Sequence, residues 1–239
     1  MPLPKIEYPV HEFYVKSLDR VVKFRPFLVK EEKILLIAKE GKDGEAIRQA
    51  IMQIIQNCSL EEIDVGQLPL FDIEMIFLKL RAKSVGESIK MVFNCQNEVD
   101  GAVCDTNTEY TLNLDKVRYE IPEGHDAKVM LTDKMGVKLK YPTLGSIPTV
   151  DSDDQFELML ESLIENIEFV FDGEQVYKIL DATEQEQVDF IESLNRESME
   201  KIENFFKTSP KVVLEDNVKC KKCGYEHTLH EENLLDFFT

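Results

Sequence analysis

Ten residues near the end of the chain, Val218-Lys219-Cys220-Lys221-Lys222-Cys223-Gly224-Tyr225-Glu226-His227 (VKCKKCGYEH), contain two cysteines separated by two residues and followed directly by a glycine. This spacing is typical of a metal-binding knuckle, in which a tight turn brings two thiolates to one ion. Gly224 suits that turn, because the backbone must bend sharply for its N–H groups to reach sulfur. A structural zinc ion needs four ligands, so the stretch predicts a second pair of cysteines elsewhere.

The second pair is Cys95 and Cys104, which eight residues separate instead of the usual two to four. The surrounding pattern supports this pair, because strand-like segments lead into and out of both pairs. Two hairpins with thiolates at their tips would close one tetrahedral site without an open position. The predicted ligands of this structural zinc are Cys95, Cys104, Cys220 and Cys223.

Two alternatives to the four-cysteine site remain open. The cysteines could be free thiols, or His227 or His230 could replace one of them in a mixed site. The fifth cysteine, Cys58, falls on the apolar face of a predicted helix and is expected in the core.

Hydrophobic periodicity predicts an α+β fold in which helical segments flank a strand-rich middle. The zinc-ribbon-like subdomain is predicted to comprise residues 88–114 and 211–230. Alternating patterns predict strands within 7–29 and at 88–94, 108–114, 117–121, 128–131, 136–141 and 212–218. Apolar spacings of three and four predict helices at 31–39, 43–58, 69–86, 154–170, 184–195 and 197–206.

The chain has 239 residues, 43% of them hydrophobic, which is enough for one large core. Without a linker-like segment, we expect a single domain over residues 1–239. Its predicted sub-regions are the N-terminal strands and helices (1–87) and the strand-rich middle (88–150). The acidic helices (151–207) and the C-terminal half of the ribbon (208–239) follow. No run of about 20 apolar residues predicts a membrane span, and the N-terminal segment lacks a signal-peptide core. Five cysteines without an export signal indicate a reducing compartment, the cytoplasm.

The formal net charge is −18, and most of it lies in one segment. Between Asp151 and Phe206 there are 17 acidic and 3 basic residues. Such a surface repels nucleic acid and anionic membranes. Two interpretations of this acidic segment are open: a helical face exposed to solvent, or a docking surface for a basic partner.

Catalytic motifs are absent from the sequence. It contains no HExxH, no glycine-rich phosphate loop and no GxSxG, and its four histidines have no companions that would form a triad. Because four thiolates leave no position for substrate or water, the predicted metal is structural, and the protein is not expected to be an enzyme.

Three stretches carry a resemblance to a known family. They are Phe24–Leu36 (FRPFLVKEEKILL), Leu70–Glu87 (LFDIEMIFLKLRAKSVGE) and the terminal cysteine knuckle. Together they resemble the baseplate hub assembly proteins of T-even-type (T4-like) contractile-tailed phages, most densely over residues 20–90. Relatives in this family often have two short C-x2-C pairs, and the longer interval between Cys95 and Cys104 departs from that pattern.

The resemblance implies a structural or assembly protein that helps to form the central hub of the tail baseplate through contacts with other hub proteins. Its members are regarded as hub subunits or as assembly catalysts, and a chaperone that leaves before completion is a variant of this role. The implied location is the host cytoplasm during assembly, or the virion tail baseplate.

Candidate partner contacts are two basic positions, Arg25 and Arg81, and two aromatic residues near the chain end, Phe237 and Phe238. The arginines could instead pair with acidic residues of the same chain. The alternative function is a zinc-ribbon adaptor or regulator that binds nucleic acid or a polymerase. Its only support is a thin basic patch beside the knuckle, at Lys219, Lys221 and Lys222.

Overall fold

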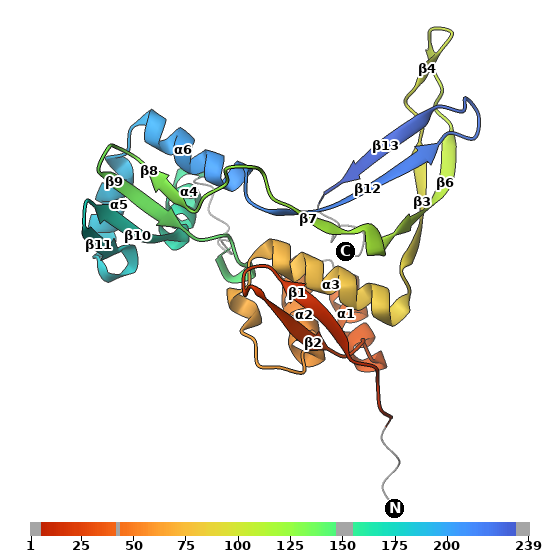
Figure 1. Ribbon diagram of the computed structural model, residues 1–239, viewed down its shortest axis with the longest axis horizontal. Coiled ribbons are helices and arrows are strands. Elements are labelled where there is room, and N and C mark those ends of the chain that lie inside the picture. Colours follow the sequence, from red (N-terminus) through yellow and green to blue (C-terminus); the bar gives the residue numbers. More distant parts are fainter. Residues whose placement is uncertain (1–5, 42–43, 147–154, 233–239) are drawn as a thin grey trace, which may run out of the picture. The chain divides into compact units, whose positions relative to one another are not determined.

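The computed structural model describes residues 6–41, 44–146 and 155–232 of an α+β protein, which confirms the predicted fold class (Figure 1). The chain groups into two compact units. The first comprises residues 1–65, 71–120 and 211–239, and the second comprises residues 66–70 and 121–210. That the whole chain folds as one domain stays a prediction.

The first unit begins with a hairpin and three helices. Strands β1 (His11–Val15) and β2 (Arg20–Phe24) pair antiparallel, as the alternating pattern predicts. Helices α1, α2 and α3 follow at Val29–Gly41, Gly44–Cys58 and Leu70–Val85. Helix α3 is apolar around most of its circumference and is therefore buried on several sides. Phe77 of α3 packs against Phe27, so the hairpin exit and the helices share a core.

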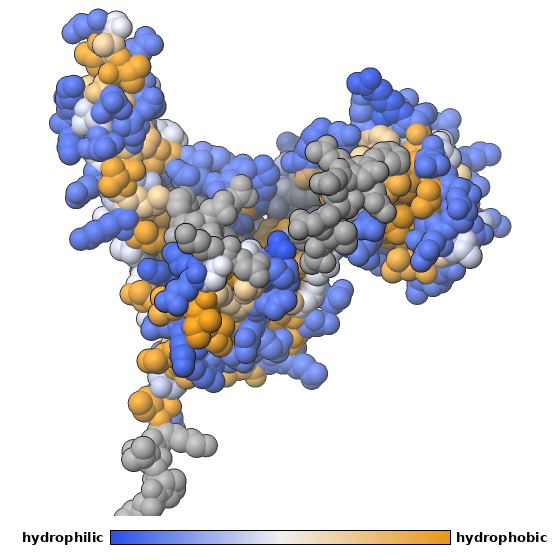
Figure 2. Space-filling model, turned by 180° about the vertical axis from the view of Figure 1, so that it is seen from behind, coloured by the Kyte–Doolittle hydropathy of each residue, from blue (hydrophilic) through white to orange (hydrophobic). Residues whose placement is uncertain are grey.

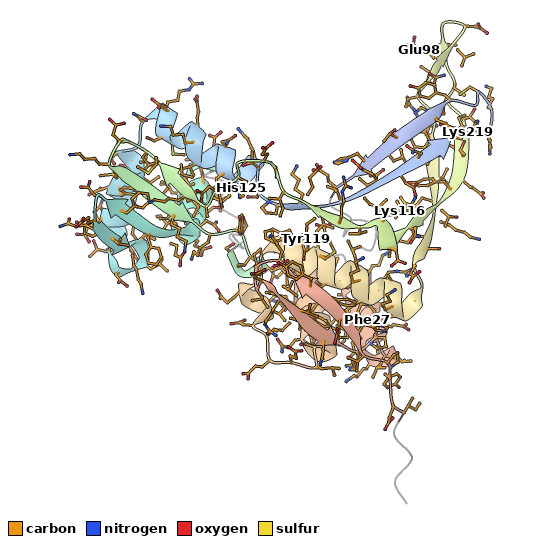
Figure 3. All side chains as sticks on the ribbon, in the orientation of Figure 1. Phe27, Glu98, Lys116, Tyr119, His125 and Lys219 are labelled. Carbon is orange, nitrogen blue, oxygen red and sulfur yellow. The ribbon has the colours of Figure 1, made fainter. Side chains whose placement is uncertain are left out.

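A buried carboxylate joins three distant segments of this unit. Asp72 of α3 is fully buried and accepts hydrogen bonds from the backbone N–H groups of Lys16 and Ser17, at 3.0 and 2.9 Å. Its Oδ1 also accepts a 2.6 Å hydrogen bond from the hydroxyl of Tyr119. Tyr119 is labelled in Figure 3, and its ring meets Phe71 edge-on. Burial first, and then the charge of Asp72, raise the pKa of Tyr119, so its hydroxyl stays protonated and donates. Asp72 therefore fixes the β1–β2 turn and the segment of Tyr119 to α3.

The rest of the first unit is built from strands. Strands β3 (Ser88–Asn94) and β6 (Asn107–Asn113) form one antiparallel pair. A second sheet has the order β13-β12-β7. Its strands are β7 (Arg118–Glu120), β12 (Lys211–Lys219) and β13 (Glu226–Glu231). The β3–β6 and β12–β13 hairpins match the predicted ribbon segments.

The second unit is a four-stranded antiparallel sheet with helices. The sheet order is β11-β10-β9-β8, with strands at Lys128–Met130 (β8), Met135–Leu139 (β9), Ile167–Asp172 (β10) and Gln175–Lys178 (β11). Its helices are α4 (Gln155–Asn166), α5 (Glu184–Glu192) and α6 (Arg196–Lys207). Val137 and Ile167 of the sheet share one core with Leu163, Ile191 and Ile202 of the helices. The described residues also contain short 3-10 helices at Val65–Gln67, Leu114–Lys116, Leu144–Ser146 and Ile179–Asp181.

One predicted helix is wrong in its second part. The periodicity extends a helix over 154–170, but α4 ends at Asn166 and the next residues form β10. The segment Ile167–Asp172 (IEFVFD) is rich in β-branched and aromatic residues, and β10 pairs with β9 on one side and β11 on the other. Pairing with both neighbouring strands provides hydrogen-bond partners for the backbone of β10 on both sides. This pairing outweighs the preference for a helix that the apolar spacing indicates. The acidic region 151–207 therefore contains a β-hairpin as well as helices.

The surface of each unit is mainly hydrophilic, with separate hydrophobic patches on the face that Figure 2 presents. Among the described residues, no helix has the length and apolarity needed to cross a membrane.

Candidate metal centre

Four cysteine side chains converge where the β3–β6 and β12–β13 hairpins of the first unit meet. The Sγ atoms of Cys95, Cys104, Cys220 and Cys223 all lie within 4.8 Å of one another. Cys95 and Cys223 are 3.7 Å apart, and Cys104 and Cys220 are 3.9 Å apart, far too long for disulfides. A tetrahedral zinc ion with bonds of about 2.3 Å holds its sulfur ligands about 3.8 Å apart. Three of the cysteines are buried and Cys223 is half-buried, so the donor set and its geometry fit a closed structural site.

Cys220 and Cys223 lie on a short knuckle between β12 and β13. Gly224 adopts φ 73° and donates its N–H to the carbonyl of Cys220 at 3.0 Å, which closes the turn. The N–H of Lys222 points to Cys220 Sγ at 3.4 Å. Together these contacts form a tight turn, as the glycine after Cys223 predicts.

Cys95 and Cys104 are separated by a small β-hairpin, which explains the long interval between them. Strands β4 (Glu98–Val99) and β5 (Ala102–Val103) pair around a two-residue turn at Asp100-Gly101. Both turn residues have positive φ, 52° and 81°, as a type I′ turn requires. The hairpin is closed at its base by a 2.8 Å hydrogen bond from the N–H of Cys104 to the carbonyl of Asn97. Figure 3 labels Glu98 on this hairpin and Lys219 at the neighbouring end of β12.

The thiolates have polar neighbours from both hairpins. His227 of β13 lies with Nε2 3.1 Å from Cys95 Sγ, and its ring contacts Phe93 and Tyr225 at centroid distances of 4.7 Å each. Asn97 directs its side-chain amide to Cys223 Sγ at 3.8 Å. His227 is thus next to the four sulfurs, in a position to donate an N–H···S hydrogen bond to a thiolate.

The knuckle backbone favours a thiolate at Cys220. Hydrogen bonds from the N–H groups of Cys223 and Lys222 lower the pKa of Cys220 to about 6. Burial raises the pKa of Cys95 to about 12, so that thiol gives up its proton only when a cation replaces it. The knuckle backbone therefore favours the deprotonated form of Cys220, and binding of a metal ion by the four thiols would release protons.

The remaining candidate residues lie elsewhere. His230 is apart from the four sulfurs, 3.1 Å from Glu215. Arg25 forms a buried ion pair with Glu31 at 2.9 Å. Arg81 donates to the carbonyl of Gly86 at 2.9 Å. Phe237 and Phe238 lie outside the described residues, and docking roles for all four candidate contacts stay predictions.

Two residues of the centre carry no signal in the sequence. Asn97 reaches Cys223 only because the β4–β5 hairpin folds back, and Thr108 joins the two halves by accepting a 3.3 Å hydrogen bond from the N–H of Lys221. Isolated asparagines and threonines are common in turns and strands, so their spacing alone does not point to a metal site.

The comparison with known families decides the class of the protein. A sequence profile described as T4 bacteriophage base plate protein matches residues 8–239, nearly the whole chain. The chain belongs to this family. The membership confirms the resemblance to T4-like phage baseplate proteins and identifies the chain as a phage baseplate structural protein. No curated protein and no solved structure matches it significantly.

Proposed function

We propose that this baseplate protein helps to form the central hub of a contractile phage tail through contacts with other hub proteins. The observation that carries the proposal is the family match over residues 8–239. The segments 24–36 and 70–87, which resemble hub assembly proteins, support the narrower proposal of a role in the hub. The role is architectural, in the host cytoplasm during assembly and in the tail baseplate.

The proposal assigns the four cysteines a structural zinc ion. Sulfur separations of 3.7 and 3.9 Å and the burial of three ligands support a closed tetrathiolate site. The ion would hold β3–β6 against β12–β13 and would leave no coordination position for a reaction. His227 would reduce the net charge on Cys95 by hydrogen bonding.

The second unit supplies a surface suited to a basic partner. Strand β11 is an edge of its sheet and is exposed along its length, with Val176 and Tyr177 62% and 53% exposed. Glu174 directly precedes this strand, and α5 of the same unit carries exposed carboxylates at its two ends, Glu184 and Glu192. An exposed apolar sheet edge in a unit with exposed acidic residues favours a partner that presents apolar and basic side chains, with charge steering the encounter.

The decisive experiment is quantitative mass spectrometry of finished phage particles and of immature tail intermediates. A fixed copy number in both would make the chain a hub building block. Presence in the intermediates alone would make it an assembly factor that leaves. Absence from both would overturn the hub proposal and favour the adaptor alternative.

The acidic surface is tested separately, by the rate at which the tagged chain associates with purified hub intermediates. A variant with Glu174, Glu184 and Glu192 changed to Gln should associate several-fold more slowly at low salt, and the difference should shrink as salt is added. The control variant removes the same charge from exposed positions of the first unit, Glu12, Glu40 and Glu109. Equal rates for the two variants would remove this surface from the proposal.

A further inference from the structure

We propose that the first unit has a second metal site, in which His230, Glu120 and Glu232 bind a divalent transition-metal ion such as zinc. These three residues come from β13, β7 and the segment that follows β13. Their ligand atoms lie within 4.8 Å of one another. The inference is independent of the hub role and of the cysteine centre.

The distances around His230 Nε2 fit ligands of a common ion better than hydrogen bonds. Nε2 lies 3.7 Å from an oxygen of Glu120 and 3.5 Å from an oxygen of Glu232. Both separations exceed the ordinary N–H···O range of about 2.7–3.2 Å. Zinc bonds of about 2.0–2.1 Å to nitrogen and oxygen put tetrahedral ligands about 3.3 Å apart, so small side-chain rotations would complete the site.

The second ring nitrogen of His230, Nδ1, is next to a carboxylate, which is the usual arrangement in metal-binding histidines. Nδ1 of His230 lies 3.1 Å from Oε1 of Glu215, which is directly opposite it in the β12–β13 ladder. A hydrogen bond from Nδ1–H to this carboxylate fixes the tautomer that leaves the lone pair on Nε2. Carboxylate–histidine–metal arrangements of this kind orient the ring and increase its basicity. Glu215 is thus a positioning residue for the proposed site.

The local charge balance leaves room for a cation. Glu215 is paired with Arg118 at 3.0 Å, and Glu232 with Lys211 at 2.8 Å. Those two cations offset only two of the three carboxylates around the imidazole. The side chains of His230 and Glu120 are 39% and 42% exposed, so an ion from solvent can reach them.

The site lies at the opposite end of the β12–β13 hairpin from the cysteine knuckle. Lys219 pairs with Glu226 next to the knuckle, whereas Glu215 pairs with His230 toward the other end. Glu120 is opposite Lys211, at the first pairing of β7 with β12. An ion there would link β7 to β13 across β12 and so tie all three strands together.

The test is a calorimetric zinc titration of the full chain after its cysteine site has been loaded with one equivalent. Protection of four thiols against a thiol reagent verifies the loading. The wild type should bind one further equivalent. His230→Gln and Glu232→Gln should lose that equivalent or bind it at least tenfold more weakly, and Glu215→Gln should weaken it about 10–100-fold.

The matched control is Glu226→Gln, an exposed glutamate on the same strand, which should bind like the wild type. Circular dichroism and thermal unfolding establish that each variant is folded. Absence of a second equivalent in the wild type, or identical titrations of the wild type and His230→Gln, would overturn the proposal. Reactivity of any thiol other than Cys58 in the loaded protein would overturn the cysteine assignment instead. The two failures are distinguishable, because the second site is measured by the difference between the wild type and His230→Gln.

Discussion

Replacing Asp72 should be the most damaging polar substitution in the first unit. The carboxylate is fully buried and accepts three hydrogen bonds, from the N–H groups of Lys16 and Ser17 and from the hydroxyl of Tyr119. A hydrogen bond to a charged group contributes about 1.5–3 kcal/mol, so Asp72→Ala should cost roughly 4–5 kcal/mol even at the low end of that range. Asp72→Asn keeps the shape and one acceptor oxygen, so its cost should be about 2–3 kcal/mol.

The assay is urea unfolding at neutral pH, with the free energy of unfolding obtained by linear extrapolation. Tyr119→Phe alone should cost about 1.5–2 kcal/mol, since it removes one of the three donors, but almost nothing when added to Asp72→Ala. The control is Asp115→Asn, an exposed carboxylate 3.7 Å from Lys83, which should change little. A cost below about 1 kcal/mol for Asp72→Ala would refute the view that this carboxylate holds the hairpin turn to α3.

Three further predictions concern the metal, pH and a helix cap. A strong chelator should remove the proposed metal ion from the cysteine site and increase amide hydrogen exchange in β12 and β13, and Cys220→Ser should have the same effect without chelator; unchanged exchange would contradict a structural metal. Burial opposes ionisation of Glu31, but hydrogen bonds from Arg25 and a backbone N–H outweigh it and lower the pKa of Glu31. The stabilisation of the fold by ionised Glu31 is therefore complete above the ordinary glutamate pKa of about 4.3 and is lost as pH falls below it. Acid unfolding of the wild type and of Glu31→Gln would measure this difference. Thr183 and Glu186 form a capping box at the start of α5, so Thr183→Ala should lower the thermal stability of the second unit by about 1 kcal/mol, measured by calorimetry, whereas Thr183→Ser should be nearly neutral.

Elements with local signals could be predicted from the sequence. Strand β3 has the predicted bounds, and α3 begins and ends within one residue of its prediction, because Pro69 and Gly86 mark its limits. Helix α5 begins at its predicted residue, Glu184, behind a capping box formed by Thr183 and Glu186. The cysteine cluster was predictable for a similar reason: thiolates at hairpin tips have few other uses in a reducing compartment.

Features that depend on tertiary pairing could not be predicted in this way. The helical spacing of α4 continues into β10, and only the two neighbouring strands reveal that Ile167–Asp172 is extended. Asp72 has the spacing of an ordinary surface residue at a helix start, and its burial depends on a turn more than 50 residues away. The sequence suggests His230 only as a possible ligand of the cysteine site. Its carboxylate neighbours could not be foreseen, because they come from three different strands or their ends.

Residues 121–210 of the second unit lie between β7 and β12 in the sequence, so they separate the two pairs of cysteine ligands during synthesis. Cys104 and Cys220 are 116 residues apart in the chain, although their sulfurs are 3.9 Å apart. At synthesis rates of about 5–20 residues per second, the first two thiols wait roughly 6–23 seconds for their partners. The ribbon is therefore the last part of the first unit to close, and any nascent chain that stops before Cys220 lacks half of its ligands. A metal ion held by all four cysteines would therefore bind only chains that have been synthesised past Cys223.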